Sequence, residues 1–176
     1  MRNLRNLFAL MLGAAAFSAS SQRSVTTLNE GWQFTKGPEA EAKEWQQVRV
    51  PHDWAIYGPF DRANDLQVVA VEQNGETEKT LKTGRTGGLP FIGKGTYRTT
   101  IEIPDTAGRA FTLLFDGAMS NSKVKLNGKE VGVWPYGYNS FYVNLDNSDL
   151  RQGKNDLVVE LENYEQASRW YPGAGL

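Results

Sequence analysis

The stretch Tyr97-Arg98-Thr99-Thr100-Ile101-Glu102-Ile103 decides the fold class of this chain. Its uncharged side chains Tyr97, Thr99, Ile101 and Ile103 occupy alternate positions, and a period of two is typical of a strand with one buried face. The same alternation recurs in the segments 111–115, 141–145 and 157–161. No amphipathic helix of normal length competes with this pattern. We therefore predict an all-β chain.

Turn signals between these segments indicate how the strands are connected. Asn127-Gly128 separates Lys125-Leu126 from Lys129-Glu130, and Asn-Gly readily adopts the positive φ angles of a two-residue hairpin. Short strands with frequent turns are typical of a β-sandwich or jelly roll, in which two sheets each bury one face. The polar, glycine-rich segment 61–93 interrupts the pattern. We interpret it as a loop that leaves the domain, because loops of this length are usually functional or mobile.

The first residues have the three parts of a secretory signal peptide. Arg2 and Arg5 precede an apolar run from Leu7 to Phe17, and small residues come after it. No later segment approaches the about 20 apolar residues of a spanning helix. The chain has no cysteine, so export brings neither disulfides nor a lipid-anchoring cysteine. We expect a signal peptide at 1–21, one domain at 22–176, and a free periplasmic or secreted protein with no membrane partner.

The charge balance argues against nucleic acid as a partner. Loss of Arg2 and Arg5 with the signal peptide leaves 17 basic and 20 acidic side chains, a net charge of about −3. Nucleic-acid binders normally carry a basic stripe that neutralises phosphates, whereas here lysine and arginine are interspersed with glutamate and aspartate throughout. We expect no nucleic-acid partner.

The single histidine restricts metal and triad chemistry. His52 has no second histidine and no cysteine beside which it could ligate zinc, so we expect no metal. Asp53 adjoins it in sequence, and neighbours on an extended segment rarely point together, which argues against a Ser-His-Asp triad. We interpret Pro51-His52-Asp53-Trp54 as a structural turn whose polar side chains hold backbone groups and whose indole fills the core.

A partial phosphate-loop motif does not indicate a nucleotide-binding site. Gly88 to Lys94 resembles the start of such a loop, but Gly95 replaces the required serine or threonine, and the next segment is a strand instead of a helix. Without a helix amino terminus the backbone donors for phosphate are not assembled. We expect no nucleotide and no other cofactor.

The most informative local feature is a cluster of five aromatic residues within nine positions, interleaved with proline, glycine and Asn139: Trp134, Tyr136, Tyr138, Phe141 and Tyr142. Aromatic faces cover the C–H faces of a sugar ring while nearby polar side chains bind its hydroxyls. The alternative is a core role, which the start of an alternating strand at Phe141 favours for that residue. For 134–139 both interpretations stay open.

A series of ordered motifs spanning residues 28–176 resembles glycoside hydrolase family 2. They are Leu28-Asn29-Glu30-Gly31-Trp32-Gln33-Phe34, Val50-Pro51-His52-Asp53-Trp54, Gly93-Lys94-Gly95-Thr96-Tyr97-Arg98, Phe115-Asp116-Gly117-Ala118, Leu126-Asn127-Gly128-Lys129-Glu130-Val131-Gly132 and Ser168-Arg169-Trp170-Tyr171-Pro172-Gly173-Ala174-Gly175. The resemblance implies the first, jelly-roll domain of a β-galactosidase-like enzyme. An immunoglobulin-like domain and a (β/α)8 barrel carrying two glutamates would come after it. Thr96 departs from the family, which commonly has tryptophan there.

The resemblance also implies where this chain would meet substrate. Asn139 corresponds to a polar residue that reaches the sugar, with Tyr138, Tyr136 and Trp134 beside it as further substrate-binding candidates. Arg169, Trp170, His52 and Asp53 are placed at the interface with the barrel or at the substrate rim. The expected partners are a β-galactoside-like carbohydrate and the downstream domains of the same polypeptide.

No catalytic pair of carboxyl groups is recognisable in the chain. A glycosidase needs two of them about 5 to 10 Å apart, whereas Glu160 with Glu162, and Glu76 with Glu78, are interpreted as solvated pairs. We expect the chain alone to be inactive. A stand-alone carbohydrate-binding module is the alternative, and a purely structural domain is a third. The resemblance places a closing strand after Leu176, so we also expect an incomplete jelly roll with an unpaired edge and marginal stability.

Overall fold

In the computed structural model, residues 23–57, 69–71, 75–78, 80–82, 91–163 and 174–176 are described. The helical elements within these ranges are short, and none of them is long and apolar enough to cross a membrane. The elements are β1 (Trp32–Lys36), η1 (Glu39–Glu41), β2 (Gln46–Val48), α1 (Trp54–Tyr57), β3 (Val69–Val71), β4 (Thr80–Lys82), β5 (Gly93–Ile103), β6 (Phe111–Phe115), β7 (Ser122–Leu126), β8 (Lys129–Trp134), β9 (Phe141–Leu145) and β10 (Gly153–Asn163).

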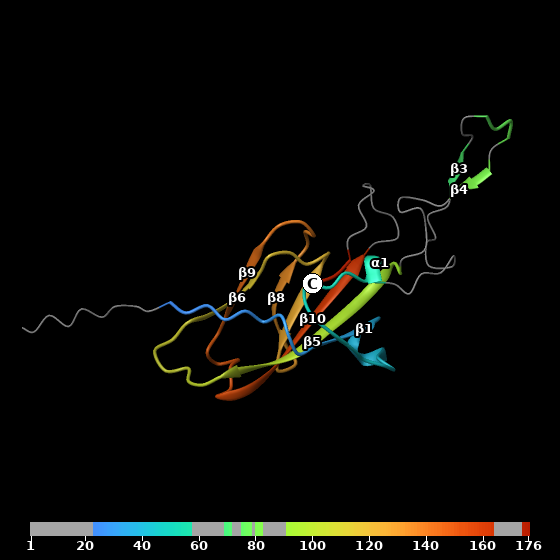
Figure 1. The fold of residues 1–176 in the computed structure, drawn as a ribbon. Helices are drawn as coiled ribbons and strands as arrows, with labels where there is room; N and C mark the ends of the chain where they lie inside the picture. The colour runs from blue at the N-terminus through green and yellow to red at the C-terminus, as the bar shows by residue number, and fades with distance from the viewer. Residues whose placement is uncertain (1–22, 58–68, 72–74, 79, 83–90, 164–173) are drawn as a thin grey trace, which may run out of the picture.

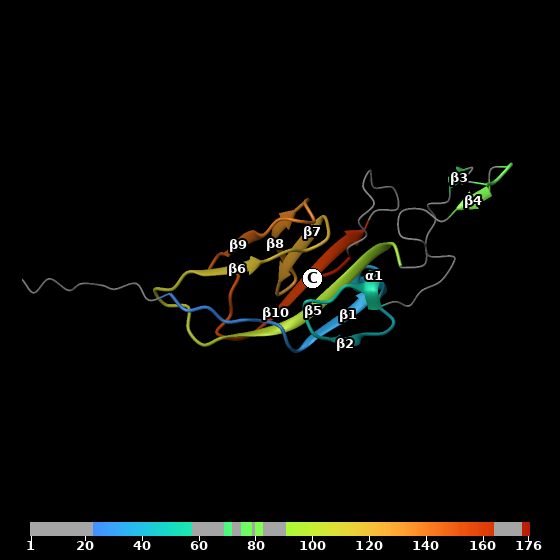
Figure 2. The same cartoon turned by 45° about the horizontal axis from the view of Figure 1, so that its top comes forward.

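Apart from β3 and β4, the described strands form a two-layered antiparallel sandwich, which confirms the predicted all-β sandwich. One sheet has six strands in the order β2-β1-β5-β10-β7-β8, and the other pairs β6 with β9. Figure 2 shows β6 and β9 lying above β5 and β10. The long strands β5 and β10 pair along their whole length, from Gly153 opposite Ile103 to Asn163 opposite Gly93.

The Asn-Gly hairpin forms between β7 and β8 as predicted. Leu126 lies opposite Lys129, so two residues make the turn, with φ of 52° at Asn127 and 84° at Gly128. The Asn127 amide also donates to the backbone carbonyl of Asp149 at 3.0 Å. The hairpin is therefore fixed both by its backbone angles and by a side-chain bond to a distant loop.

The inner faces of the two sheets make the core, and the alternating positions supply it as predicted. On β5 and β10, Tyr97 and Val159 are fully buried and lie opposite each other. Trp54 of α1 closes one end of the core and stacks on Phe34 of β1, with ring centroids 5.3 Å apart. Gly95 leaves room for that indole, because a Cβ atom there would lie only 2.6 Å from it.

The segment 61–93 departs from its prediction as a loop. Val69–Val71 and Thr80–Lys82 pair as an antiparallel ladder, β3 with β4. Figures 1 and 2 both show this pair well away from the sandwich. The prediction missed these strands because three residues are too few to show a period of two. Most other residues of the segment lie outside the described part of the chain.

Candidate functional site

The segment containing His52 and Asp53 is held by hydrogen bonds from its own polar side chains. His52 is 8% exposed, and its Nδ1 atom lies 2.7 Å from the Tyr97 hydroxyl. One Asp53 carboxylate oxygen accepts from the backbone N–H groups of Ala55, at 2.8 Å, and Ala174, at 3.1 Å. The bond to Ala55 caps the start of α1. These contacts agree with the predicted structural role of the Pro51–Trp54 segment.

Residues 174–176 run between this segment and Met119. The His52 N–H donates to the Leu176 carbonyl at 2.7 Å, and the Leu176 N–H donates back at 3.1 Å. On the other side, the Met119 N–H donates to the Gly175 carbonyl at 3.0 Å. Gly175 is thus bridged to two chain segments at once, and a Cβ atom on it would overlap the His52 carbonyl oxygen.

The aromatic loop between β8 and β9 rests on the same Met119 segment. The Asn121 N–H donates to the Pro135 carbonyl at 3.3 Å, and Gly137 packs so closely on the Met119 sulfur that a Cβ atom would overlap it. The structure therefore brings two groups of sequence-predicted site residues to opposite sides of residues 174–176. One group is His52 and Asp53, and the other is the loop 135–140.

The aromatic cluster divides into a buried and an exposed half. Phe141 is 3% exposed and stacks between Phe115, at 4.7 Å, and Trp134, at 5.3 Å. Tyr136 and Tyr138 are 62% and 66% exposed. The core interpretation therefore holds for Phe141, while Tyr136, Tyr138 and the exposed Asn139 are accessible to a ligand or another domain.

Trp134 lies at the border between these halves. Its ring is half-buried, packs edge-on against Tyr136 at 5.8 Å, and carries a buried indole N–H that has no hydrogen-bond partner in the described part of the chain. Trp134 therefore packs against the exposed Tyr136 from the core side of the loop. Direct contact of Trp134 with substrate stays a prediction, and Arg169 and Trp170 lie outside the described residues.

Sequence reasoning missed Met119 and Gly137. Met119 joins the aromatic loop to residues 174–176 through its backbone and its sulfur, and no local pattern around it predicts such long-range contacts. The only sequence signal for Gly137 is its position among aromatic residues, because a glycine there lets another chain segment pack closely against the backbone.

Burial shifts the pKa values of His52 and of its hydrogen-bond partner Tyr97. It lowers the pKa of His52 below the ordinary 6.5, and the opposing influence of the Asp53 carboxylate is smaller. Burial likewise raises the pKa of the Tyr97 hydroxyl, with a smaller contribution from Asp53. A neutral imidazole beside an un-ionised phenol suits a structural hydrogen bond. It does not suit proton transfer to a substrate, because both groups are enclosed.

The lowered pKa of His52 makes stability depend on pH. The imidazole binds a proton less readily in the folded than in the unfolded chain, so the unfolded state gains protons first as pH falls. We expect the free energy of unfolding to be greatest above pH 6.5 and to decline as pH falls from there toward the lower folded-state pKa. Urea unfolding between pH 8 and pH 5 measures this decline, which His52→Gln should reduce. Equal declines in both proteins would contradict the assignment to His52.

Comparisons with known proteins extend over almost the whole chain. The chain matches no family model. It is 35% identical over 175 residues to a β-galactosidase of Bacteroides ovatus, covering 94% of this chain and 19% of that protein. It is 31% identical over 176 residues to a protein of Formosa agariphila named as a putative β-glucuronidase, covering 95% of this chain and 15% of that one.

Solved structures show the same likeness in three dimensions. A glycosyl hydrolase family 2 member from Bacteroides cellulosilyticus superposes with a TM-score of 0.63 at 27% identity, covering 85% of this chain and 19% of that one. A β-glycosidase from Bacteroides vulgatus superposes with a TM-score of 0.61 at 29% identity, covering 84% of this chain and 18% of that one. The chain thus spans less than a fifth of the length of the curated relatives it matches.

Proposed function

The chain belongs to glycoside hydrolase family 2, and on that premise we propose that it is the amino-terminal domain of an exported β-galactosidase-like enzyme that hydrolyses O-glycosidic bonds. The observation that carries this proposal is the 35% identity to a β-galactosidase across 94% of the chain. Residues 1–21 would direct export to the periplasm or the medium. The domain would shape the substrate entrance, and further domains of the same polypeptide would complete the site.

The loop 135–140 is the part of this chain that would contact sugar. It is anchored at Gly137 on Met119 and at Pro135 on Asn121, so its backbone is fixed before substrate arrives. Asn139 and Tyr138 are exposed on this anchored loop. An amide held on a fixed backbone can bind a sugar hydroxyl at small entropic cost, and the tyrosine rings can cover the C–H faces of the sugar.

The chemistry itself would come from the barrel that the family resemblance implies. Glu160 pairs with Lys125 at 2.8 Å on the outer face of the six-stranded sheet. Glu162 is engaged through its backbone, which exchanges two hydrogen bonds with Ser120. On the family resemblance, the acid and the nucleophile would be the two barrel glutamates.

The rival proposal is a stand-alone carbohydrate-binding module, which the exposed Tyr136 and Tyr138 would also suit. The gene beyond the codon for Leu176 distinguishes the two proposals. A reading frame that continues into a barrel with two glutamates supports the enzyme domain. A stop codon at that point supports the binding module.

Asn139→Ala in the complete polypeptide tests the proposed role of the loop. We expect kcat/KM for an aryl β-galactoside to fall by up to about tenfold, because one hydrogen bond to a sugar hydroxyl contributes about 0.5 to 1.5 kcal/mol. The melting temperature should not change, since Asn139 is exposed. Asn144→Ala is the matched control, because Asn144 is an exposed amide of β9 that bonds Thr112 at 2.8 Å. An unchanged kcat/KM for Asn139→Ala would remove this residue from the site.

A further inference from the structure

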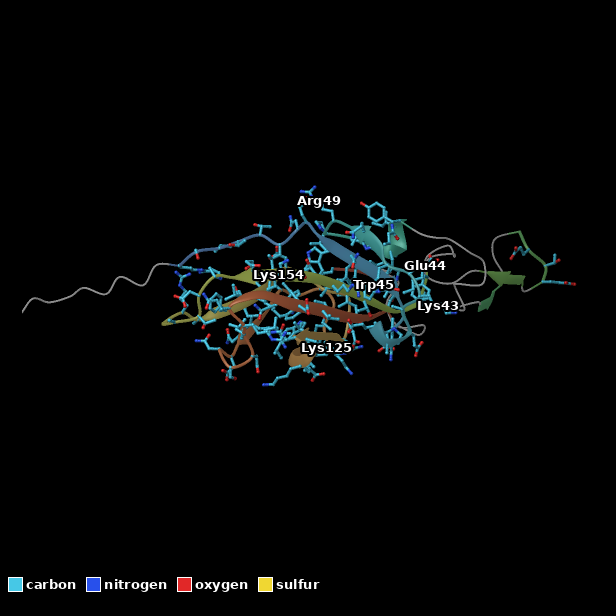
Figure 3. All side chains as sticks on the ribbon, turned by 90° about the horizontal axis from the view of Figure 1, so that it is seen from below. Lys43, Glu44, Trp45, Arg49, Lys125 and Lys154 are labelled. Carbon is cyan, nitrogen blue, oxygen red and sulfur yellow. The ribbon has the colours of Figure 1, made fainter. Side chains whose placement is uncertain are left out.

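The chain between β1 and β2 lies at one edge of the six-stranded sheet. After Lys36 it passes through η1 and returns as β2, which pairs with β1 in antiparallel register. Just before β2, Trp45 reaches across β1 to β5, where its ring lies over the Arg98 guanidinium at 3.8 Å from the ring centroid. Figure 3 views the molecule from this side and shows Trp45 close to Lys43 and Glu44.

The orientation of the Trp45 indole is fixed by the protein. Arg98 donates from Nε to the Gln33 side chain at 2.8 Å, and this bond helps to hold the guanidinium beneath the ring. A cation stacked on an indole is attracted by the electrons of the ring face. A ligand that stacks on this tryptophan therefore does not need to order it first, which favours binding.

Beside Trp45 the surface is hollowed into a shallow, open depression of about 480 Å³. Two lysines and two glutamates around it cancel in formal charge, and Gln46 adds an exposed amide. The lining residues are Phe34, Thr35, Lys36, Glu41, Lys43, Glu44, Trp45 and Gln46.

We propose that this depression binds one neutral hexopyranose unit of an oligosaccharide, with the sugar ring packed against Trp45. A sugar ring offers an apolar C–H face and a rim of hydroxyls, and the depression offers an indole surrounded by groups that donate and accept hydrogen bonds. The four charged residues that line the depression cancel in formal charge, so the lining itself carries no net charge that would select an anionic ligand such as a phosphate. The charged rim equally disfavours a purely apolar ligand.

This binding would involve residues other than those of the Asn139 loop, at the edge of the six-stranded sheet formed by β1 and β2. The proposal stands on Trp45, Arg98 and the depression. A failure of the Asn139 experiment would therefore leave it intact, and its own failure would leave the proposed function intact.

Titration of the full chain with β-1,4-linked galactotetraose tests the proposal, monitored by ¹H–¹⁵N spectra with assigned indole resonances. The Trp45 indole should shift with sugar concentration, while those of the buried Trp32 and Trp54 should stay in place. We expect Trp45→Ala to weaken binding by about tenfold or more, the equivalent of about 1.4 kcal/mol. Tyr142→Ala is the matched control, because Tyr142 is 66% exposed on β9 in the other sheet.

Two outcomes would overturn the proposal. One is no shift of the Trp45 indole at sugar concentrations up to roughly 10 mM, ten times a Kd of 1 mM. The other is binding that Trp45→Ala leaves unchanged. If Trp45→Ala fails to fold, Gln46→Ala replaces it, since this exposed amide lines the depression. The indole shift in the unmodified chain decides the question in either case.

Discussion

Replacing Trp54 with alanine should lower the free energy of unfolding by about 3 to 5 kcal/mol, the range for truncating a buried tryptophan. Trp54 has 0% exposure, stacks on Phe34 at 5.3 Å and on Tyr97 at 6.4 Å, and donates from Nε1 to the Phe91 carbonyl at 2.9 Å. Alanine would leave a cavity between two aromatic rings and a carbonyl without its partner.

Urea unfolding of the chain measures this loss. Ile56→Ala is the matched control, because Ile56 is a large apolar residue of the same short helix but is 68% exposed. We expect it to change the free energy of unfolding by at most about 0.5 kcal/mol, as is usual for surface positions. A loss below about 1 kcal/mol for Trp54→Ala would contradict the placement of this indole in the core, where truncation normally costs several times more.

Gly175→Ala should destabilise the domain by about 3 kcal/mol, at the upper end of what forced packing normally costs. The added methyl group would overlap the His52 carbonyl oxygen, and that oxygen belongs to backbone paired with Leu176. Flexible side chains can move away from an added methyl group, but backbone held by two hydrogen bonds cannot do so without losing them. The contact of Gly175 with Met119 would be strained at the same time.

A thermal melt of the chain tests the Gly175 prediction. A loss of about 3 kcal/mol corresponds to a lowering of Tm by about 6 to 12 °C for a domain of this size. Gly117→Ala is the control, because the nearest atom that its Cβ would meet is the Gly137 carbonyl oxygen at 4.0 Å. A Tm for Gly175→Ala as high as that of Gly117→Ala would show that residues 174–176 are not held against His52 in solution.

The strands of the sandwich could be predicted because their information is local. A period of two marks β5, β6, β9 and β10, and Asn127-Gly128 marks the hairpin, so neither depends on knowing distant partners. The short strands β3 and β4 were not predicted, because three residues are too few to show a period of two. The contact between Trp45 and Arg98 was not predicted either, because these residues are far apart in the sequence and meet across a strand that lies between them.

The candidate site was predictable in its residue types but not in its geometry. Composition singled out the aromatic loop, yet only the structure separates the buried Phe141 from the exposed Tyr138. The structural role of the segment at His52 was predicted, but its partner Tyr97 lies 45 residues away and on another strand. Met119 joins these regions through backbone contacts, which leave no pattern in side-chain chemistry.

The most direct test of the central claim is a crystal structure of the complete polypeptide with galactose bound. The claim is that this domain extends its β8–β9 loop into the substrate entrance. It predicts that the Asn139 side-chain amide lies within about 3.2 Å of a sugar hydroxyl, the upper limit of an ordinary hydrogen bond. A bound sugar that no residue of the loop 135–140 approaches within about 4.5 Å, the limit of van der Waals contact, would contradict it.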